Sequence, residues 1–200
     1  MPDPQLHDLA VKTADHLLQG AWEAVVPPEG HPGIYLHGPG QATLYLRHAR
    51  RDRTRVAVSG HYPDSDVQPR SVVIKVAAAR GPAALAAAIR ARLLPDYLSE
   101  LAKVLAHNRQ RTQAAKRRRD NAAALATLLP GATVHEHGRD TTVVGWHPRT
   151  AGETLGEVSV TLSHDPQRAH LELRGVPVDL AEQIVRLIQQ HLSQARASGM

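Results

Sequence analysis

The chain has 200 residues, of which 42% are hydrophobic, a composition typical of a globular rather than a disordered protein. It contains no Phe and no Cys, so aliphatic residues must fill the core, and disulfides and thiolate metal sites are excluded. No apolar run approaches the ~20 residues of a membrane span, and the N-terminus lacks a secretory pattern. We therefore expect a cytoplasmic protein without a membrane partner.

The basic charge is concentrated in the middle of the chain. The 24 Lys and Arg residues outnumber the 19 Asp and Glu residues, for a formal net charge of +5. Residues 101–120 hold seven basic residues and one acidic residue, so this segment carries +6 and the remainder −1. The sequence thus predicts a near-neutral protein with one basic segment. Arg outnumbers Lys by 20 to 4, which a GC-rich coding genome explains more simply than phosphate recognition does.

The N-terminal segment has the apolar spacing of a helix over residues 4–24, which ends before Pro27-Pro28. The apolar stripe consists of Leu6, Leu9, Ala10, Leu17, Ala21 and Val25. Four short strands are predicted next, at 33–37, 41–48, 54–60 and 71–78. Gly38-Pro39-Gly40 joins the first two as a tight hairpin, and Gly81-Pro82 begins a helix that runs to about residue 94.

Alternation along these strands separates two faces of an antiparallel sheet when the first hairpin is centred on Pro39. The inward face contains only apolar residues, namely Ile34, Leu36, Ala42, Leu44, Leu46, Val56, Val58, Val72, Ile74 and Val76. The outward face contains Tyr35, His37, Gln41, Thr43, Tyr45, Arg47, Arg55, Ala57, Ser59, Val73, Lys75 and Ala77. Flanking helices must cover the inward face, and we expect the outward face to be open to solvent.

A single long helix is predicted over residues 95–129, with a break near 107–112 as the alternative. Both ends of this helix carry apolar residues, but its middle offers only two alanines between His107 and Asn121. A helix that is polar all round has no core to face. We therefore expect its middle to be a solvated basic connector.

The last part of the chain repeats the order of elements. Strands are predicted at 132–137, 141–147, 156–162 and 168–174, and a helix at 177–195. His37-Gly38 and His137-Gly138 lie 100 residues apart. In the helices that follow the sheets, Pro82, Leu85, Ile89 and Leu93 match Pro177, Leu180, Ile184 and Ile188. The two halves therefore resemble diverged copies of a single unit.

We predict an α+β fold of two tandem αββββα units, each an antiparallel sheet with helices on one face, joined by a long basic helix. About 100 residues can bury a core without disulfides or metals, so the chain accommodates two such units. The expected divisions are a first repeat at 1–94, a basic connecting helix at 95–119 and a second repeat at 120–200.

The outward face of the second sheet is rich in histidine and is not net basic. Its residues are His135, His137, Thr141, Val143, His147, Ser159, Thr161, His170 and Glu172, while Val158, Val160, Leu162, Leu171 and Leu173 point inward. Two histidines at i and i+2 can share a metal, but the predicted hairpin pairs His147 with position 131, roughly 13 Å along the strand from His135. We therefore expect no metal site and no cofactor.

Phosphate binding is the function that the basic segment favours, because clustered cations attract phosphate and release counterions. The predicted contact residues on the long helix and on the open face of the first sheet are Lys103, Arg109, Arg111, Lys116, Arg117, Arg118, Arg119, Arg47, Arg55 and Lys75. Four consecutive basic residues point all around a helix, and a solvated connector is the competing interpretation. Tyr35 and Tyr45 can stack bases beside the sheet cations, although no ribonucleoprotein motif is present.

Catalysis has no signature in this sequence. It contains no G-x-S-x-G elbow, no Walker A loop, no G-x-G-x-x-G and no HExxH. We therefore predict a non-enzymatic nucleic-acid-binding protein that makes mainly backbone contacts. The alternative is a protein-interaction or assembly module that uses open sheet faces or exposed helices to bind a protein partner or a second copy, without nucleic acid. A metal-dependent enzyme is the third hypothesis.

Overall fold

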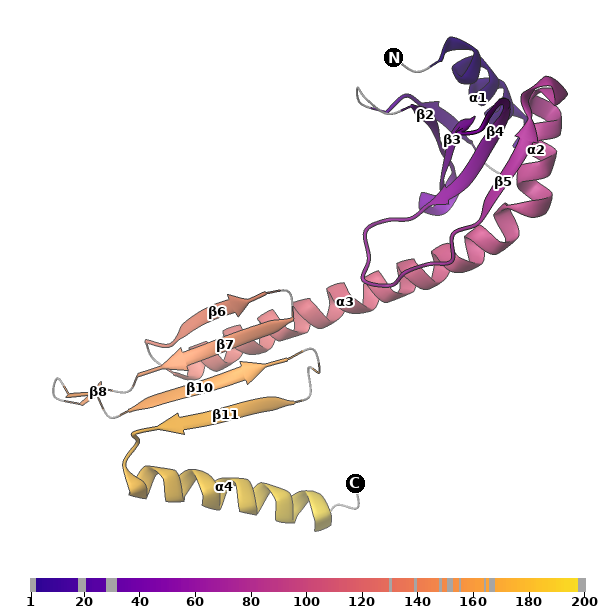
Figure 1. Cartoon of the computed structure of the whole chain (residues 1–200). Helices are drawn as coiled ribbons and strands as arrows, with labels where there is room; N and C mark the ends of the chain where they lie inside the picture. The colour runs from indigo at the N-terminus through magenta and orange to yellow at the C-terminus, as the bar shows by residue number, and fades with distance from the viewer. Residues whose placement is uncertain are drawn as a thin grey trace. The chain divides into compact units, whose positions relative to one another are not determined.

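The computed structural model describes residues 3–17, 21–27, 32–129, 131–138, 140–147, 149–150, 153–154, 156–163, 165 and 168–197. The chain divides into two compact units, unit 1 (Met1–Arg109) and unit 2 (Gln110–Met200). Each unit contains one main antiparallel sheet, of five strands in unit 1 and four in unit 2, together with helices (Figure 1). The predicted α+β fold is therefore confirmed, with one strand more in unit 1 than expected.

Unit 1 follows the predicted order of helix, strands and helix. Its elements are α1 (Pro4–His16), β1 (Glu23–Val25), β2 (Gly33–His37), β3 (Thr43–Ala49), β4 (Asp52–His61), β5 (Val73–Ala77) and α2 (Gly81–Arg92). The strands pair in the order β1-β2-β3-β4-β5. The apolar face of this sheet packs against α1 and α2, and the core includes Leu6, Ile34, Leu36, Leu44, Leu46, Val58, Leu85 and Ile89.

The helix α1 ends at His16, so the helix predicted over residues 4–24 is wrong for residues 21–24, and β1 is an additional strand; residues 18–20 lie outside the described residues. Residues Glu23–Val25 pair with β2, with Val25 opposite Tyr35. Two successive valines precede Pro27. Branched side chains suit strands, and the residue before a proline avoids the helical region, so this short segment adopts an extended backbone.

The β2–β3 hairpin is centred on Gly40 instead of Pro39. Gly40 has a φ of 63°, which glycine adopts readily and proline cannot. Tyr35 is therefore opposite Tyr45. The shift changes each pairing partner by two residues, so both predicted faces of the sheet are preserved.

Tyr97, in the first turn of α3 (Leu94–Leu128), contributes its side chain to the core of unit 1. Its side chain is completely buried, and its ring lies against Gly60, where any Cβ would collide with it. The Tyr97 hydroxyl accepts a hydrogen bond from the Thr43 backbone N–H at 2.7 Å and donates one to the His61 carbonyl oxygen at 2.9 Å. One side chain thus joins α3 to both β3 and β4.

Unit 2 contains the C-terminal part of α3, a sheet and a last helix. Its further elements are β6 (Thr133–His137), β7 (Thr141–Trp146), β8 (Arg149–Thr150), β9 (Glu153–Thr154), β10 (Glu157–Leu162), β11 (Ala169–Arg174) and α4 (Val178–Ala197). The main sheet has the order β11-β10-β7-β6, and β8 and β9 form an additional small hairpin. Ala122 of α3 packs on Val144, Val160 and Leu162, so the inward face of this sheet is the apolar one, as predicted.

The long helix is present without a break over Leu94–Leu128; most residues of its middle are exposed, and the prediction of a solvated middle is wrong only at Arg118. In unit 1, the side chain of Asn108 donates to the carbonyl oxygen of Asp64 at 3.1 Å. In unit 2, Arg118 is only 4% exposed. Polar contacts, rather than apolar ones, attach the middle of α3 to its own units.

The pattern of buried residues in the first helix of each unit supports the internal repeat, with a different spacing between the two copies than the sheets show. The buried residues of α1 and its end are Leu6, Ala10, Thr13, Ala14 and Leu17. A shift of 112 positions takes them to Arg118, Ala122, Leu125, Ala126 and Leu129, which are all buried or half-buried. Arg118 thus occupies the position that Leu6 holds in unit 1, and the larger offset reflects the extra segment that contains β1.

The helix α4 matches α2 in sequence but not in packing. Leu93, at the end of the α2 stripe, is fully buried, whereas its counterpart Ile188 on α4 is 49% exposed. Among the α4 side chains that the structure describes, Val178, Val185 and Leu187 are also large, apolar and exposed. In the described part of the chain, no other helix or strand packs extensively against α4, which follows the edge strand β11 (Figure 1). Unit 2 therefore leaves an apolar helix face open.

Candidate nucleic-acid interface

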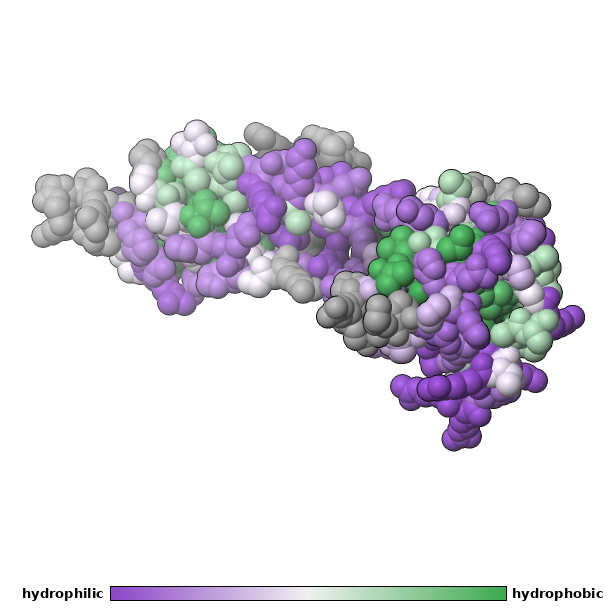
Figure 2. Space-filling model, turned by 90° about the horizontal axis from the view of Figure 1, so that it is seen from above, coloured by the Kyte–Doolittle hydropathy of each residue, from purple (hydrophilic) through white to green (hydrophobic). Residues whose placement is uncertain are grey.

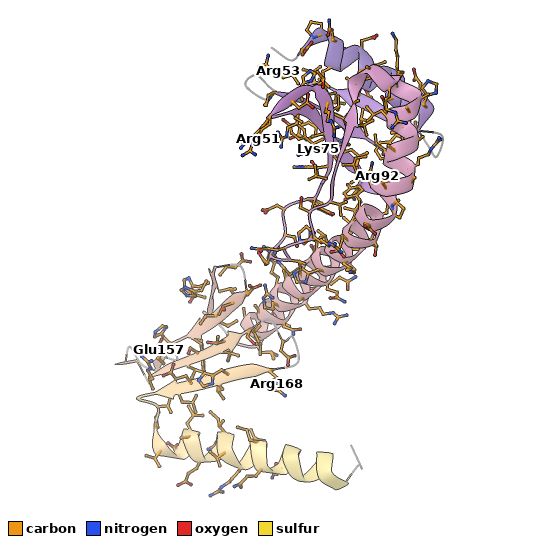
Figure 3. All side chains as sticks on the ribbon, turned by 45° about the vertical axis from the view of Figure 1, so that its right-hand side comes forward. Arg51, Arg53, Lys75, Arg92, Glu157 and Arg168 are labelled. Atoms are coloured by element: carbon orange, nitrogen blue, oxygen red, sulfur yellow. The ribbon has the colours of Figure 1, made fainter. Side chains whose placement is uncertain are left out.

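The β3–β4 hairpin of unit 1 carries a dense basic cluster. Residues 47–55 contain five arginines and one aspartate. Lys75 joins them, because Arg47, Ala57 and Lys75 lie side by side across β3, β4 and β5. In Figure 3, Arg51 and Arg53 extend from the hairpin and Lys75 lies on β5, while Arg92 lies on α2. We name this group the arginine patch; its members are Arg47, Arg50, Arg51, Arg53, Arg55 and Lys75.

The arginine patch lines two hollows on the surface of unit 1. One, of about 430 Å³, has Arg47, Arg55 and Lys75 among its walls. The other, of about 550 Å³, has Arg47, Tyr45 and Asp3 among its walls. Hydrophilic residues, purple in Figure 2, gather on the part of unit 1 that projects toward the lower right of that view. Because Arg47 borders both hollows, they form neighbouring parts of one cationic surface.

Two carboxylates accompany the six cations of the arginine patch, which leaves a formal net charge of +4. Hydrogen bonds from the hydroxyl and the backbone N–H of Thr54 lower the pKa of Asp52. A hydrogen bond from the Gln5 backbone N–H lowers the pKa of Asp3, and contact with His48 lowers it further. Both carboxylates are therefore ionised at neutral pH, yet they neutralise only part of the patch, which attracts anions.

The same open face carries four clustered rings beside the arginine patch. The ring centroid of Tyr35 lies 5.0 Å from that of Tyr45, 5.4 Å from that of His61 and 6.1 Å from that of His37. We name these four residues the aromatic patch. Burial raises the pKa of the Tyr45 hydroxyl and nearby Tyr35 raises it further, whereas Arg47 lowers it. Tyr45 and Arg47 also line the same hollow, so the two patches adjoin.

The predicted contact residues on α3 divide between the two units. Lys103 and Arg109 belong to unit 1, and both are exposed, although Lys103 pairs with Glu100 at 2.6 Å. Lys116 and Arg117 belong to unit 2 and are also exposed. These four cations are accessible to an external phosphate.

The other predicted residues of the helix lie around a polar pocket of about 320 Å³ in unit 2, lined by Arg111, Arg118, Arg119 and Glu136. Arg119 pairs with Glu136 at 2.8 Å, which lowers the pKa of Glu136. The buried guanidinium of Arg118 lies 3.9 Å from the carboxylate of Asp140. Arg118 is therefore not accessible to an external phosphate, and Arg119 is partly neutralised by its own unit.

Sequence reasoning found half of the arginine patch. Strand alternation placed Arg47, Arg55 and Lys75 on the outward face, and the sheet register brings them together. Arg50, Arg51 and Arg53 are additional. Five arginines within nine residues could have indicated them. The net charge of −1, summed over all residues outside 101–120, gave no sign of this local cluster. The description of a near-neutral chain with a single basic segment is thus corrected to two basic segments.

The histidine-rich face of unit 2 has the predicted register, with His135 opposite Val143 and Thr133 opposite Gly145. The His135 side chain contacts the Thr133 hydroxyl at 3.2 Å. Within the described residues, no three His, Asp or Glu side chains are grouped to hold a metal ion. The described part of this face is a polar sheet surface without the charge of the arginine patch.

Comparison of the chain with protein-family models, with curated proteins and with solved structures finds no match. None of the helices in the described ranges combines the length and the apolar character that crossing a lipid bilayer requires. A function for this chain therefore has to be argued from its surfaces.

Proposed function

We propose that this protein is a non-enzymatic nucleic-acid-binding protein that contacts phosphates through the arginine patch of unit 1. The observation that carries this proposal is the convergence of six cations around two adjoining hollows on an open sheet face. Guanidinium groups hold phosphate oxygens through paired hydrogen bonds, and several cations together favour a polyanion because binding releases counterions. The exposed cations of α3 belong to the proposal as further phosphate contacts; they are Lys103, Arg109, Lys116 and Arg117.

The residues around the two hollows suit binding rather than chemistry. The Nδ1 atom of His48 lies 2.9 Å from the Arg53 carbonyl oxygen, and its Nε2 atom lies 3.1 Å from the Asp3 carboxylate. Both ring nitrogens are thus engaged by the protein itself. Among the described residues that line the hollows there is no Ser or Cys to serve as a nucleophile. Phosphate contacts carry little sequence information, so the proposal includes weak sequence specificity. We also propose that the protein acts in the cytoplasm.

Reversal of two exposed cations of the arginine patch tests this proposal. We expect Arg51→Glu combined with Lys75→Glu to weaken oligonucleotide binding about 100-fold, because each change removes a charge-assisted contact and adds repulsion. Fluorescence anisotropy of a labelled oligonucleotide at low salt measures this loss.

The matched control is Lys12→Glu combined with Arg92→Glu. These exposed residues lie on α1 and α2, which pack on the opposite face of the sheet, and their reversal changes the net charge by the same amount. We expect the control variant to bind nearly as well as wild type. Equal weakening in both variants would show that net charge governs binding rather than the arginine patch. Failure of the wild-type protein to bind any oligonucleotide at low salt would refute the proposal.

The open apolar face of α4 favours a second function, assembly with another copy of this chain. Leu187 and Ile188 lie three and four residues beyond Ile184, on the same side of the helix, and are 65% and 49% exposed. Burial of one such side chain contributes ~1.5–3 kcal/mol, and exposed apolar patches on folded proteins commonly mark interaction sites. Pairing of α4 with the same helix of a second copy would remove these side chains from water.

Light scattering after size-exclusion chromatography tests assembly through α4. We expect a wild-type dimer and a monomeric Leu187→Glu, Ile188→Glu variant, because an unpaired carboxylate resists burial. The control, Gln183→Glu with Gln190→Glu, adds the same charge to α4 at polar positions and should stay dimeric. A wild-type protein that is monomeric at high concentration would contradict assembly without affecting the proposal of nucleic-acid binding.

A further inference from the structure

We infer that the ligand of unit 1 is a single-stranded nucleic acid whose bases stack on the aromatic patch while its phosphates contact the arginine patch. This inference rests on the proposed function and narrows the class of ligand. It follows from the order of the rings and cations along the sheet and from the accessibility of the rings.

The sheet register arranges the rings and the cations in successive rows on the outward face. Across the strands these rows are His37-Thr43-His61, then Tyr35-Tyr45-Ser59-Val73, then Arg47-Ala57-Lys75. Neighbouring rows are two residues apart along each strand, which is about 6.7 Å. The surface therefore changes from aromatic to cationic over a distance comparable to that between a base and its own phosphate group.

Gly33 determines where the ring of Tyr45 lies. A Cβ atom at position 33 would come within 2.6 Å of Cε2 and Cζ of Tyr45, so the ring occupies the space above the glycine. Arg47 is the cross-strand partner of Gly33, and it lines the larger hollow together with Tyr45. A base stacked on Tyr45 would thus place its phosphate next to a guanidinium group.

The aromatic patch is accessible to a ligand. His37 and His61 are exposed and Tyr35 and Tyr45 are half-buried, while α1 and α2 pack on the opposite face of the sheet. The His37 ring is positioned by its Nδ1 atom, 3.1 Å from the Thr43 hydroxyl. Tyr35 and the three rings around it therefore offer a continuous platform for about two bases.

A double helix cannot use this platform, because its base faces are stacked on one another inside the duplex. It would contact the cations alone. A single strand exposes its base faces, and stacking on aromatic side chains tolerates any sequence because every base has a π-face. The combination of adjoining rings and cations therefore favours single strands over duplexes.

Competition binding at one salt concentration tests this inference, with a short single strand, as RNA and as DNA, against a blunt duplex of equal length. We expect the wild-type protein to prefer single strands by about tenfold or more. Tyr35→Leu with Tyr45→Leu should weaken single-strand binding by about tenfold or more and duplex binding by far less, because a duplex contacts the cations beside Tyr45 and not its ring face. Tyr35→Phe with Tyr45→Phe keeps both rings and should bind single strands as wild type does.

The outcomes separate the inference from the proposed function. Equal wild-type affinity for single strands and duplexes, or unchanged single-strand binding by the leucine variant, would overturn the inference and leave the proposed function standing. Binding of neither ligand by the wild-type protein would overturn both. The comparison of the two ligands uses the wild-type protein, so it decides the question even if the leucine variant does not fold.

Discussion

Replacement of Tyr97 by alanine should destabilise unit 1 by ~3–5 kcal/mol, the usual cost of removing a large buried aromatic ring. The ring is fully buried against Gly60, and its hydroxyl joins backbone groups of Thr43 and His61. Tyr97→Phe should cost ~1–2 kcal/mol, because it retains the ring but leaves a partly buried N–H and a partly buried carbonyl oxygen without this partner. The difference between the two variants separates packing from hydrogen bonding.

Urea unfolding followed by tryptophan fluorescence measures both losses. Trp22 belongs to unit 1 and Trp146 to unit 2, so a Trp146→Phe background reports on unit 1 alone. Tyr62→Phe is the control, because Tyr62 is half-buried and its hydroxyl donates to the Arg70 carbonyl oxygen at 3.1 Å near the surface. This control should cost less than ~0.5 kcal/mol. Equal stability of the Tyr97→Phe and Tyr62→Phe variants would contradict the role of the buried hydroxyl.

A rise in salt from 50 to 200 mM should weaken single-strand binding by about 300-fold. The arginine patch alone, with one phosphate contact for each of its six cations, predicts a slope of about −4 when log K is plotted against log salt, and each α3 cation that contacts a phosphate makes the slope steeper. A duplex held by the same six cations should give a slope of about −5, because the duplex releases more counterions per contact. Anisotropy titrations at several salt concentrations measure both slopes.

The charge-reversed variants sharpen the salt experiment. Arg51→Glu with Lys75→Glu should reduce the magnitude of the single-strand slope by about 1 to 1.5, because two contacts are lost. A wild-type slope much steeper than −4 would show that the exposed cations of α3 also contact phosphates. An affinity that does not change with salt would exclude phosphate contacts as the source of binding.

Periodicity in the sequence predicted the faces of both sheets correctly. Leu36, Leu44 and Val58 are buried as expected, and Tyr35 and Arg47 lie on the other face. These assignments are unchanged by the shift of the hairpin centre from Pro39 to Gly40, because successive side chains alternate between the faces of a strand regardless of which residues they pair with. The partner itself depends on the turn, so the contact between the two outward tyrosines of β2 and β3 could not be predicted.

Strand patterns in the sequence could not predict the whole arginine patch. Arg50, Arg51 and Arg53 lie at the end of the hairpin, where alternation assigns a side chain to neither face. Arg50 and Arg51 line one hollow together with Lys75, and this approach depends on the antiparallel register of β3, β4 and β5. A count of charged residues in short windows of the sequence would have found the arginines. Their grouping with Lys75 could be seen only from the strand pairing in the structure.

The α+β class, the two units and the outward position of Arg47 were determined by the sequence itself, because backbone geometry imposes the periods of helices and strands. Only the tertiary structure decided which cations can reach a ligand. Arg118 belongs to a run of four basic residues, yet it is buried near Asp140 in the position that Leu6 holds in unit 1. Burial and ion pairing depend on residues distant in the chain, so the tertiary structure, and not the charge count, places the proposed interface on the sheet of unit 1.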